Sequence, residues 1–172
     1  MIDYNILTRE QLIALCKHYQ HEAYLGKIDP LTSTLNRRGA NYEFKRLQKT
    51  NQLKNKKLVF IDIDHFKSIN DVHGHEFGDF ALKTISHKLK EYFKDDIIIR
   101  FGGDEFLIIT DKDTDYINKF NYVFSKIYNF KDIEIPISSS IGITNYEEGL
   151  DLDSWINLAD REMYINKRLK KA

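Results

Sequence analysis

The sequence has one cysteine, Cys16, no net charge and no long apolar run. A single cysteine excludes an internal disulfide and a cysteine-based zinc cluster, and it is typical of a reducing cytoplasm. Because 26 basic residues balance 26 acidic ones, no overall field attracts nucleic acid, and phosphate binding has to depend on locally placed cations. The chain also lacks a signal peptide and the roughly 18 to 20 apolar residues of a membrane helix. We therefore expect a cytoplasmic protein that binds neither nucleic acid nor membranes.

The apolar content that is present is enough for a folded core. Hydrophobic residues make up 42% of the 172 residues, and ten Tyr and eleven Phe are among them. This composition excludes intrinsic disorder. The length suits one compact domain with an appendage and leaves no room for a separate sensor domain. We expect a helical extension over residues 1–28 and the main domain over residues 29–172.

The extension has the pattern of a helix over residues 8–26. Thr8 and Gln11 form a capping box, and Gly26 ends the helix. A narrow apolar stripe follows the helical spacing, through Leu12, Cys16, Tyr19 and Ala23. This stripe can pack on its own domain or on a partner helix, and the sequence leaves both open. The pair Asp29-Pro30 is typical of a helix start and predicts a second helix through about residue 50.

Hydrophobic spacing and turn residues predict the remaining elements. They are a strand at 58–61, a helix at 75–93, strands at 97–101 and 105–109, a helix at 114–128, a strand at 133–143 broken near Pro136, and a helix at 152–169. The two central strands form a hairpin through Gly102-Gly103-Asp104. The order β-α-β-β-α-β indicates an α+β fold of the ferredoxin-like, palm type, an antiparallel sheet with helices on one face and extra helices at both ends.

Acidic residues follow the first strand and occupy the tip of the hairpin. Asp62 and Asp64 are two residues apart, so both project from the same face of the sheet. If the hairpin lies beside this strand, Asp104 and Glu105 reach the same sheet end. Clustered oxygen ligands of this kind suit Mg²⁺. The structural alternative is that the two aspartates cap the following helix and that the Gly-Gly tip is an ordinary turn.

Three motifs together favour the functional interpretation. They read DPLTSTLNRR at 29–38, FIDIDHFKSINDVHGHEFGD at 60–79 and RFGGDEF at 100–106. In order and spacing they resemble the GGDEF family of diguanylate cyclases, and the resemblance extends over about residues 29–171. It implies a palm-like fold and the condensation of two GTP into cyclic di-GMP with release of pyrophosphate. It also implies a homodimer in which each protomer presents one GTP.

The resemblance assigns a metal site to this chain. Asp62, the backbone carbonyl of Ile63 and Asp104 match the metal-binding positions, for Mg²⁺ or Mn²⁺, and two ions are possible. Glu105 matches a further catalytic position that either activates the 3′-hydroxyl or helps to hold the metal. Asp64 either serves a second ion or is structural. Arg100 is expected to brace the acidic hairpin tip.

The resemblance also assigns the substrate contacts. Asn70 and Asp79 match the pair that reads guanine, because an Asp accepts hydrogen bonds from guanine N–H groups and an amide donates to its acceptors. Gly102 and Gly103 let the hairpin backbone approach the α-phosphate. The remaining substrate-binding positions, largely for the triphosphate, are His65, Phe66, Lys67, Lys167 and Lys171. For the basic C-terminal residues the alternative is a solvated helix end that complements the helix dipole.

The sequence departs from the family pattern at several positions. Ser33-Thr34 stand where Gly-Leu is usual, Glu162 and Asn166 replace alanines in the last helix, and Lys170-Lys171-Ala172 replace Gly-Arg-Asn. These changes weaken the expected packing on the base and the grip on phosphate.

One departure bears on feedback. Many members bind their product through an Arg-x-x-Asp sequence, and here Phe93 stands at the Arg position while Asp96 keeps the Asp. We therefore predict no tight product inhibition at this site.

Two other functions remain as alternatives. One is a weakly catalytic module that binds GTP or a cyclic dinucleotide and signals through a partner, and the other is a cyclase with a different base preference, against which Asp79 argues.

Overall fold

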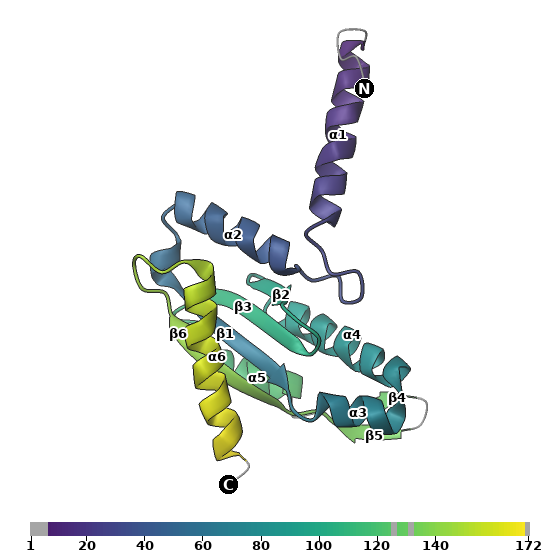
Figure 1. Ribbon diagram of the computed structural model, residues 1–172, viewed down its shortest axis with the longest axis vertical. Helices are drawn as coiled ribbons and strands as arrows, with labels where there is room; N and C mark the ends of the chain where they lie inside the picture. The colour runs from purple at the N-terminus through teal and green to yellow at the C-terminus, as the bar shows by residue number, and fades with distance from the viewer. Residues whose placement is uncertain (1–6, 125–126, 131–132, 171–172) are drawn as a thin grey trace.

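A four-stranded antiparallel sheet forms the centre of the molecule, in the strand order β2-β3-β1-β6 (Figure 1). The computed structural model describes residues 7–124, 127–130 and 133–170. The strands are β1 (Lys56–Ile63), β2 (Ile97–Arg100), β3 (Glu105–Asp111) and β6 (Ser139–Asn145). β1 pairs with β3 on one side and with β6 on the other. This order confirms the predicted split βαβ arrangement.

The two helices of the βαββαβ order lie on one face of the sheet, as expected, and the extra helices near the two ends of the chain cover the other face. α4 (His75–Tyr92) and α5 (Tyr116–Phe124) pack on one face, and α2 (Arg37–Lys49) and α6 (Leu152–Leu169) pack on the other. The physical reason is visible in β1, where the side chains of Leu58, Val59, Phe60 and Ile61 are all buried. A strand with apolar side chains on both sides needs a cover on both faces.

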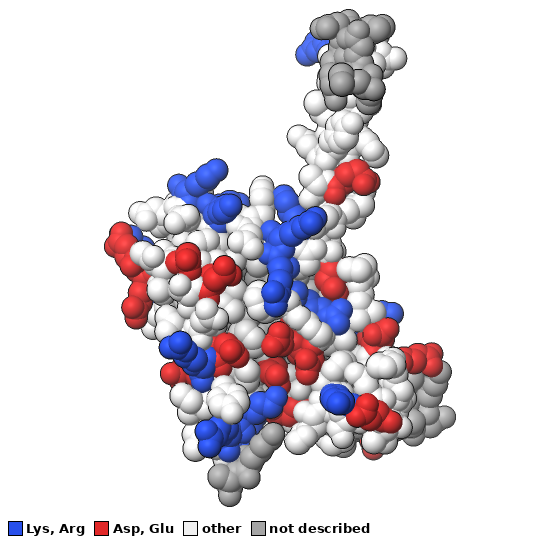
Figure 2. Space-filling view, in the orientation of Figure 1, with Lys and Arg blue, Asp and Glu red and all other residues white. Residues whose placement is uncertain are grey.

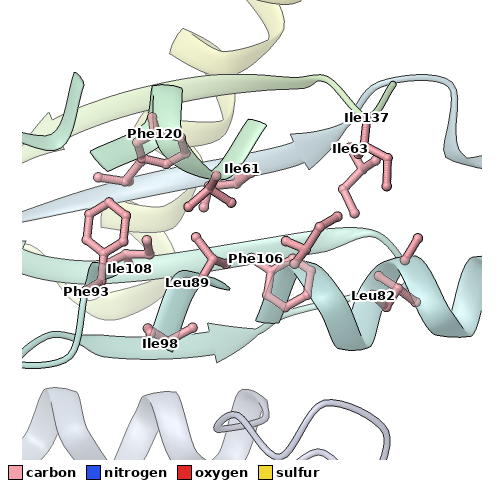
Figure 3. Packing of buried hydrophobic residues seen from close by; sticks show 14 of the residues in the cluster. Ile61, Ile63, Leu82, Leu89, Phe93, Ile98, Phe106, Ile108, Phe120 and Ile137 are labelled. Carbon is pink, nitrogen blue, oxygen red and sulfur yellow. The ribbon is translucent and has the colours of Figure 1, made fainter. Parts of the chain in front are cut away.

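The two faces hold separate apolar clusters. On the α4 face, Ile61, Phe106 and Ile108 of the sheet pack against helix residues including Leu82 and Leu89 (Figure 3). On the other face, Phe60 and Leu107 belong to a cluster with Phe44 and Trp155. α6 approaches the sheet closely at Gly142, where a Cβ would overlap the backbone of Ala159 and Met163. Together these clusters fix the ends of β1, β3 and α6 relative to one another.

The segment before α2 is a turn, so the helix start predicted at Pro30 is wrong, although the helix ends at Lys49, close to the predicted residue 50. The backbone N and the hydroxyl of Thr32 both donate to Oδ1 of Asp29, at 2.9 and 2.7 Å. α2 begins only at Arg37, after the N-cap Asn36. The reason is tertiary: the backbone N–H of Leu35 donates to Ile98 and its carbonyl accepts from Arg100, which keeps the chain extended there.

The Ser33-Thr34 departure lies in this turn. Ser33 has a φ of +54°, in the left-handed region that favours glycine. Lys90 donates to the carbonyl oxygens of Thr32 and Ser33, at 3.0 and 3.3 Å. Thr34 is buried, and its hydroxyl shares a hydrogen bond of 2.9 Å with that of Thr32. A side chain at position 33 is thus accommodated by neighbouring hydrogen bonds at some cost in backbone strain.

Several shorter elements refine the prediction. The helix expected through residue 128 ends at Phe124, and β4 (Ile127–Phe130) follows and pairs with β5 (Ile133–Pro136). The break near Pro136 is confirmed, since β5 and β6 are separate strands. A short helix, α3 (Phe66–His73), lies between β1 and α4, and a 3₁₀ turn, η2 (Leu53–Asn55), precedes β1.

α1 (Arg9–Leu25) has no buried residue and extends away from the rest of the molecule (Figure 1). Its capping box is as predicted, with Gln11 N donating to the Thr8 hydroxyl at 3.2 Å and Thr8 N donating to Oε1 of Gln11 at 2.8 Å. The apolar stripe therefore does not pack on its own domain. Across the described part of the chain, no helix is both long and apolar enough to cross a membrane.

Candidate active site

Three carboxylates gather where β1 ends and β3 begins. Asp62 pairs in register with Glu105, and the backbone N–H of Ile63 donates to the carbonyl oxygen of Asp104 at 3.3 Å. Figure 2 shows acidic side chains grouped near the middle of this face, over the ends of these two strands. The expectation that the hairpin lies beside the first strand is therefore confirmed. We call Asp62, Asp104 and Glu105 the acidic edge.

The charges of the acidic edge are poorly balanced. Burial raises the pKa of Asp104, and the charge of Asp62 raises it further. The pKa of Glu105 is raised by burial and then by Asp104 and Asp62. Asp62 accepts a hydrogen bond from the ammonium of Lys167. Burial by itself lowers the pKa of Lys167, but the hydrogen bond and the charge of Asp62 outweigh it, and the pKa rises. Lys167 and Arg100 lower the pKa of Asp104, and Arg37 lowers that of Glu105, but burial and the neighbouring carboxylates outweigh them, so the site favours an additional cation.

Asp64 has a different environment although it lies only two residues from Asp62. Its Oδ1 accepts from the Ser140 hydroxyl at 2.6 Å, and its Oδ2 accepts from the Ser138 hydroxyl at 2.9 Å and from Lys170 Nζ at 3.4 Å. Burial raises the pKa of Asp64, but these hydrogen bonds and the Lys170 charge outweigh burial and lower it. Of the two roles left open by the sequence, the hydrogen bonds favour the structural one, a link between β1, β6 and the end of α6.

Arginines brace the hairpin tip, as predicted for Arg100. Its Nε and Nη2 donate to the carbonyl oxygen of Gly103 at 3.1 and 2.8 Å, and its Nη1 lies 3.2 and 3.3 Å from the carboxylate oxygens of Asp29. Arg37, which the sequence reasoning missed, donates to the carbonyl oxygen of Phe101 at 2.8 Å and lies over its ring. The two guanidinium groups hold the backbone of the tip in place.

The two glycines of the tip have different surroundings. A Cβ at Gly102 would lie 2.5 Å from Oε2 of Glu105, whereas one at Gly103 would have no neighbour within 4 Å. Gly102 therefore makes room for the Glu105 carboxylate, and Gly103 leaves the outer side of the tip open. Both observations are compatible with a close approach of another molecule to the tip.

A cavity of about 380 Å³ lies beside the acidic edge, lined by Asp64, His65, Ser138, Lys167 and Lys170. Two of the predicted substrate-binding residues, His65 and Lys167, therefore line it. Lys170 was not predicted, although its spacing of three residues from Lys167 places both on one helix face. Lys67 is exposed on α3, Phe66 packs against the core, and Lys171 lies outside the described residues.

The predicted guanine-reading residues lie on neighbouring helices. Asn70 is on α3 and half-buried, and Asp79 is on α4 and exposed. The two helices pack against each other. The fold therefore brings to one region two side chains that are nine residues apart in the sequence.

The residues of the acidic edge fit a divalent cation. Within the described ranges, no group of three or more His, Cys, Asp and Glu side chains is arranged to hold a metal. The available donors are the carboxylates of Asp62 and Asp104 together with backbone carbonyl oxygens. Mg²⁺ is usually held by one or two carboxylates and completes its shell with water and substrate phosphates. Burial and the charge of Asp62 raise the pKa of Asp104, so a cation bound beside these two carboxylates would stabilise the ionised form of Asp104.

Comparison with known sequences identifies the family. The family model described as "Diguanylate cyclase, GGDEF domain" matches residues 26–172. Diguanylate cyclase DosC of Escherichia coli strain K12 is 31% identical over 173 residues, which cover 94% of this chain and 38% of DosC. Cyclic di-GMP phosphodiesterase NbdA of Pseudomonas aeruginosa is 38% identical over 95 residues, which cover 54% of this chain and 12% of NbdA. The chain therefore spans well under half the length of these two relatives.

Solved structures agree with this result. The coiled coil and GGDEF domain of DgcB from Caulobacter crescentus, in complex with c-di-GMP, superposes with a TM-score of 0.79 at 22% identity and covers 92% of this chain and 90% of that one. The GGDEF domain of PA1120 from Pseudomonas aeruginosa has a TM-score of 0.72 at 31% identity and covers 83% and 89%. The DgcB structure shows that this chain has the same fold, and the PA1120 domain is also similar to it in sequence. The chain belongs to the GGDEF domain family of diguanylate cyclases.

Proposed function

We propose that the protein is a diguanylate cyclase, a nucleotidyltransferase that condenses two GTP into cyclic di-GMP and releases pyrophosphate. The observation that carries this proposal is the acidic edge. Burial and neighbouring carboxylates raise the pKa values of Asp104 and Glu105, and the acidic edge lies beside a cavity lined by two lysines. An unbalanced acidic cluster next to cationic groups suits a metal-bound triphosphate.

The proposed metal ligands are Asp62, Asp104 and the carbonyl oxygen of Ile63, with Mg²⁺ or Mn²⁺ as the ion and two ions possible. A bound ion would neutralise charge on the triphosphate and polarise the α-phosphate. Lys167, which bonds to Asp62, would then turn to a phosphate oxygen. Glu105 has a raised pKa, which suits a group that accepts the proton of the attacking 3′-hydroxyl.

The remaining substrate contacts are with the base and with the three phosphates. Asn70 and Asp79 would read the guanine edge, which excludes adenine because adenine lacks the matching donors. The backbone of Gly102 and Gly103 would lie near the α-phosphate. The β- and γ-phosphates would lie in the lysine-lined cavity, with contacts from Lys67, Lys167 and Lys171. His65 and Phe66 are further proposed substrate-binding residues.

Catalysis requires two copies of the chain, because one domain holds one GTP and each 3′-hydroxyl must face the other α-phosphate. We propose a two-fold dimer aided by pairing of α1, whose apolar stripe has no partner in its own domain. Deletion of residues 8–26 should make the specific activity depend more steeply on protein concentration. An unchanged dependence would show that α1 has another role.

We propose that product inhibition through an Arg-x-x-Asp site is absent. Phe93, at the Arg position, is fully buried and packs edge-on against Phe120. The carboxylate of Asp96 lies 3.6 Å from Lys119 Nζ, so it already has a cationic partner. Progress curves with added cyclic di-GMP test this proposal. Strong inhibition far below the GTP concentration, abolished by Asp96→Ala, would disprove it.

Incubation of the purified protein with Mg²⁺ and GTP, followed by identification of the product by mass, tests the proposed function. We expect cyclic di-GMP and two pyrophosphates per product molecule. Binding of GTP without turnover would favour the alternative of a signalling module. An adenine-containing product from mixed nucleotides would favour a cyclase of different base preference.

A further inference from the structure

Helices α3 and α4 meet at Gly78, a buried residue in the second turn of α4. A Cβ at this position would overlap Oδ1 of Asn70 and would lie 3.0 Å from its Cγ and 3.1 Å from Cζ of Phe66. Two side chains of α3 therefore occupy the space that any other residue at position 78 would fill. The contact fixes how closely α3 approaches α4.

The backbone conformation of Gly78 does not explain why glycine is there. Among the glycines of the described chain, only Gly74 and Gly149 have a positive φ, and Gly78 has ordinary helical geometry. Glycine inside a helix is less favourable than alanine, because it has more backbone freedom to lose on folding. The close approach of Asn70 is thus the feature that requires the missing side chain.

The neighbour of Gly78 connects this contact with recognition of the base. Asp79 follows Gly78 directly on α4 and is exposed, and Asn70 lies against Gly78 from α3. The two side chains that we assign to guanine therefore stand on either side of one helix contact. A change in that contact would move Asn70 relative to Asp79.

We propose that Gly78 is a positioning residue for base selection, which holds Asn70 in register with Asp79. The inference rests on the proposed function, in which these two side chains read guanine. Gly78 itself touches neither substrate nor metal in this account. It acts by leaving room for the Asn70 amide, and a pair of groups placed to match guanine discriminates against a base that leaves them unpaired.

The substitution Gly78→Ala tests this proposal. The overlapping atoms belong to ends of side chains and not to backbone, so the Asn70 side chain can rotate away and the fold should survive. We expect the preference for GTP over ATP, measured as the ratio of kcat/KM values, to fall about 10-fold, as for Asn70→Ala. The loss should lie mainly in a higher KM for GTP.

Two other glycines provide matched controls. Gly142→Ala introduces a Cβ that overlaps the backbone of α6, on the face of the sheet opposite to the cluster that contains α3, so it should lower stability without changing the GTP/ATP ratio. Gly26→Ala places a Cβ 3.6 Å from its nearest neighbour, at the end of α1, and should change neither. These variants separate a change in base selection from a general loss of stability.

The double variant Gly78→Ala/Asn70→Ala tests whether Gly78 affects base selection by positioning Asn70 or in another way. Because Gly78 acts through Asn70, the double variant should have the GTP/ATP ratio of Asn70→Ala alone. It should also unfold at a higher temperature than Gly78→Ala, because the Asn70 side-chain atoms that the new Cβ overlaps are removed. The unfolding temperatures of the two variants can be compared even if Gly78→Ala folds poorly. A wild-type ratio in Gly78→Ala, or a further loss in the double variant, would overturn the proposal. A wild-type protein that makes cyclic di-GMP yet shows no GTP preference would instead overturn the assignment of Asn70 and Asp79.

Discussion

Two groups of carboxylates at the same end of β1 have opposite properties. Asp64 accepts hydrogen bonds from two serines and from Lys170, and its pKa is lowered. Asp104 and Glu105 are also partly buried, but their nearest charged neighbours include other carboxylates, and their pKa values are raised. Burial acts in the same direction on both groups, so the partners of each carboxylate decide its ionisation.

The carboxylates of this region therefore differ in role: one stabilises the fold, and the others are available to bind a cation. A carboxylate whose oxygens are already satisfied by the fold contributes to stability and has little capacity for another ligand. A carboxylate held near others without enough donors costs stability, and it gains most from a cation that arrives with the substrate. Asp62 lies between these two cases, because its carboxylate neighbours Asp104 and Glu105 but also accepts a hydrogen bond from Lys167.

The largest effect should come from removing a charge of the acidic edge. Asp62→Asn or Asp104→Asn should lower the rate of cyclic di-GMP synthesis by about 100-fold or more, the scale of losing one group that stabilises charge in a transition state. Circular dichroism should show an unchanged fold. Asp111→Asn, at the other end of β3, is the control and should retain full activity, since Asp111 only pairs with Lys56 at an exposed position. Full activity in either of the first two variants would contradict the metal assignment.

An intermediate effect is expected at Asp64, this time on stability. Asp64→Ala leaves the Ser140 hydroxyl, which is in a buried residue, without its acceptor. The free energy of unfolding should fall by about 1–3 kcal/mol, the cost of an unsatisfied polar group. Urea unfolding measures this change, with Asp104→Asn as the comparison. An Asp64→Ala protein as stable as the wild type would remove the distinction between the two groups of carboxylates.

The smallest effect concerns stability and pH. The folded-state pKa of Asp104 lies above its unfolded-state value, so the ionised group costs stability at neutral pH. This cost decreases as the pH falls through the raised pKa and is gone below the unfolded-state pKa. Without divalent ions, Asp104→Asn should therefore unfold about 2 °C above the wild type near neutral pH, the shift expected for about 1 kcal/mol or less in a domain of this size.

Thermal unfolding of both proteins at lower pH tests whether ionisation of Asp104 causes the difference. Below the ordinary carboxyl pKa of about 4, Asp104 is protonated in both the folded and the unfolded wild type, and the difference in stability between the two proteins should vanish. Added Mg²⁺ should raise the unfolding temperature of the wild type more than that of the variant. A variant that is less stable than the wild type at neutral pH would show that Asp104 is already neutralised by the fold.

The sequence predicted the acidic edge well because its evidence is local and repeated. Asp62 ends an apolar strand, Asp104 and Glu105 end a Gly-Gly turn, and the βαββαβ order places the two segments side by side. The helix start at Pro30 failed for the opposite reason. Asp29-Pro30 is compatible with a helix, but the pairing of Leu35 with β2 keeps this segment extended, and local sequence does not record that partner.

Some residues around the site likewise depend on contacts that local sequence does not reveal. Ser140 is identified only by its contact with Asp64, which lies 76 residues away in the chain. The helical spacing from Lys167 points to the face on which Lys170 lies, but its carboxylate partner, Asp64, is 106 residues away. Gly78 belongs to a sequence motif, but its structural role depends on Asn70, a side chain of another helix. No periodicity or composition signals contacts of this kind.

The sequence by itself determined the order of the elements, the caps of α1, the break at Pro136 and the residues of the acidic edge, since each depends on a few neighbouring positions. The tertiary structure decided which faces of the sheet are covered, which carboxylates are satisfied and how α3 lies against α4. The physical reason is that hydrogen-bond partners, burial and the ionisation they control are set by atoms brought together from distant parts of the chain.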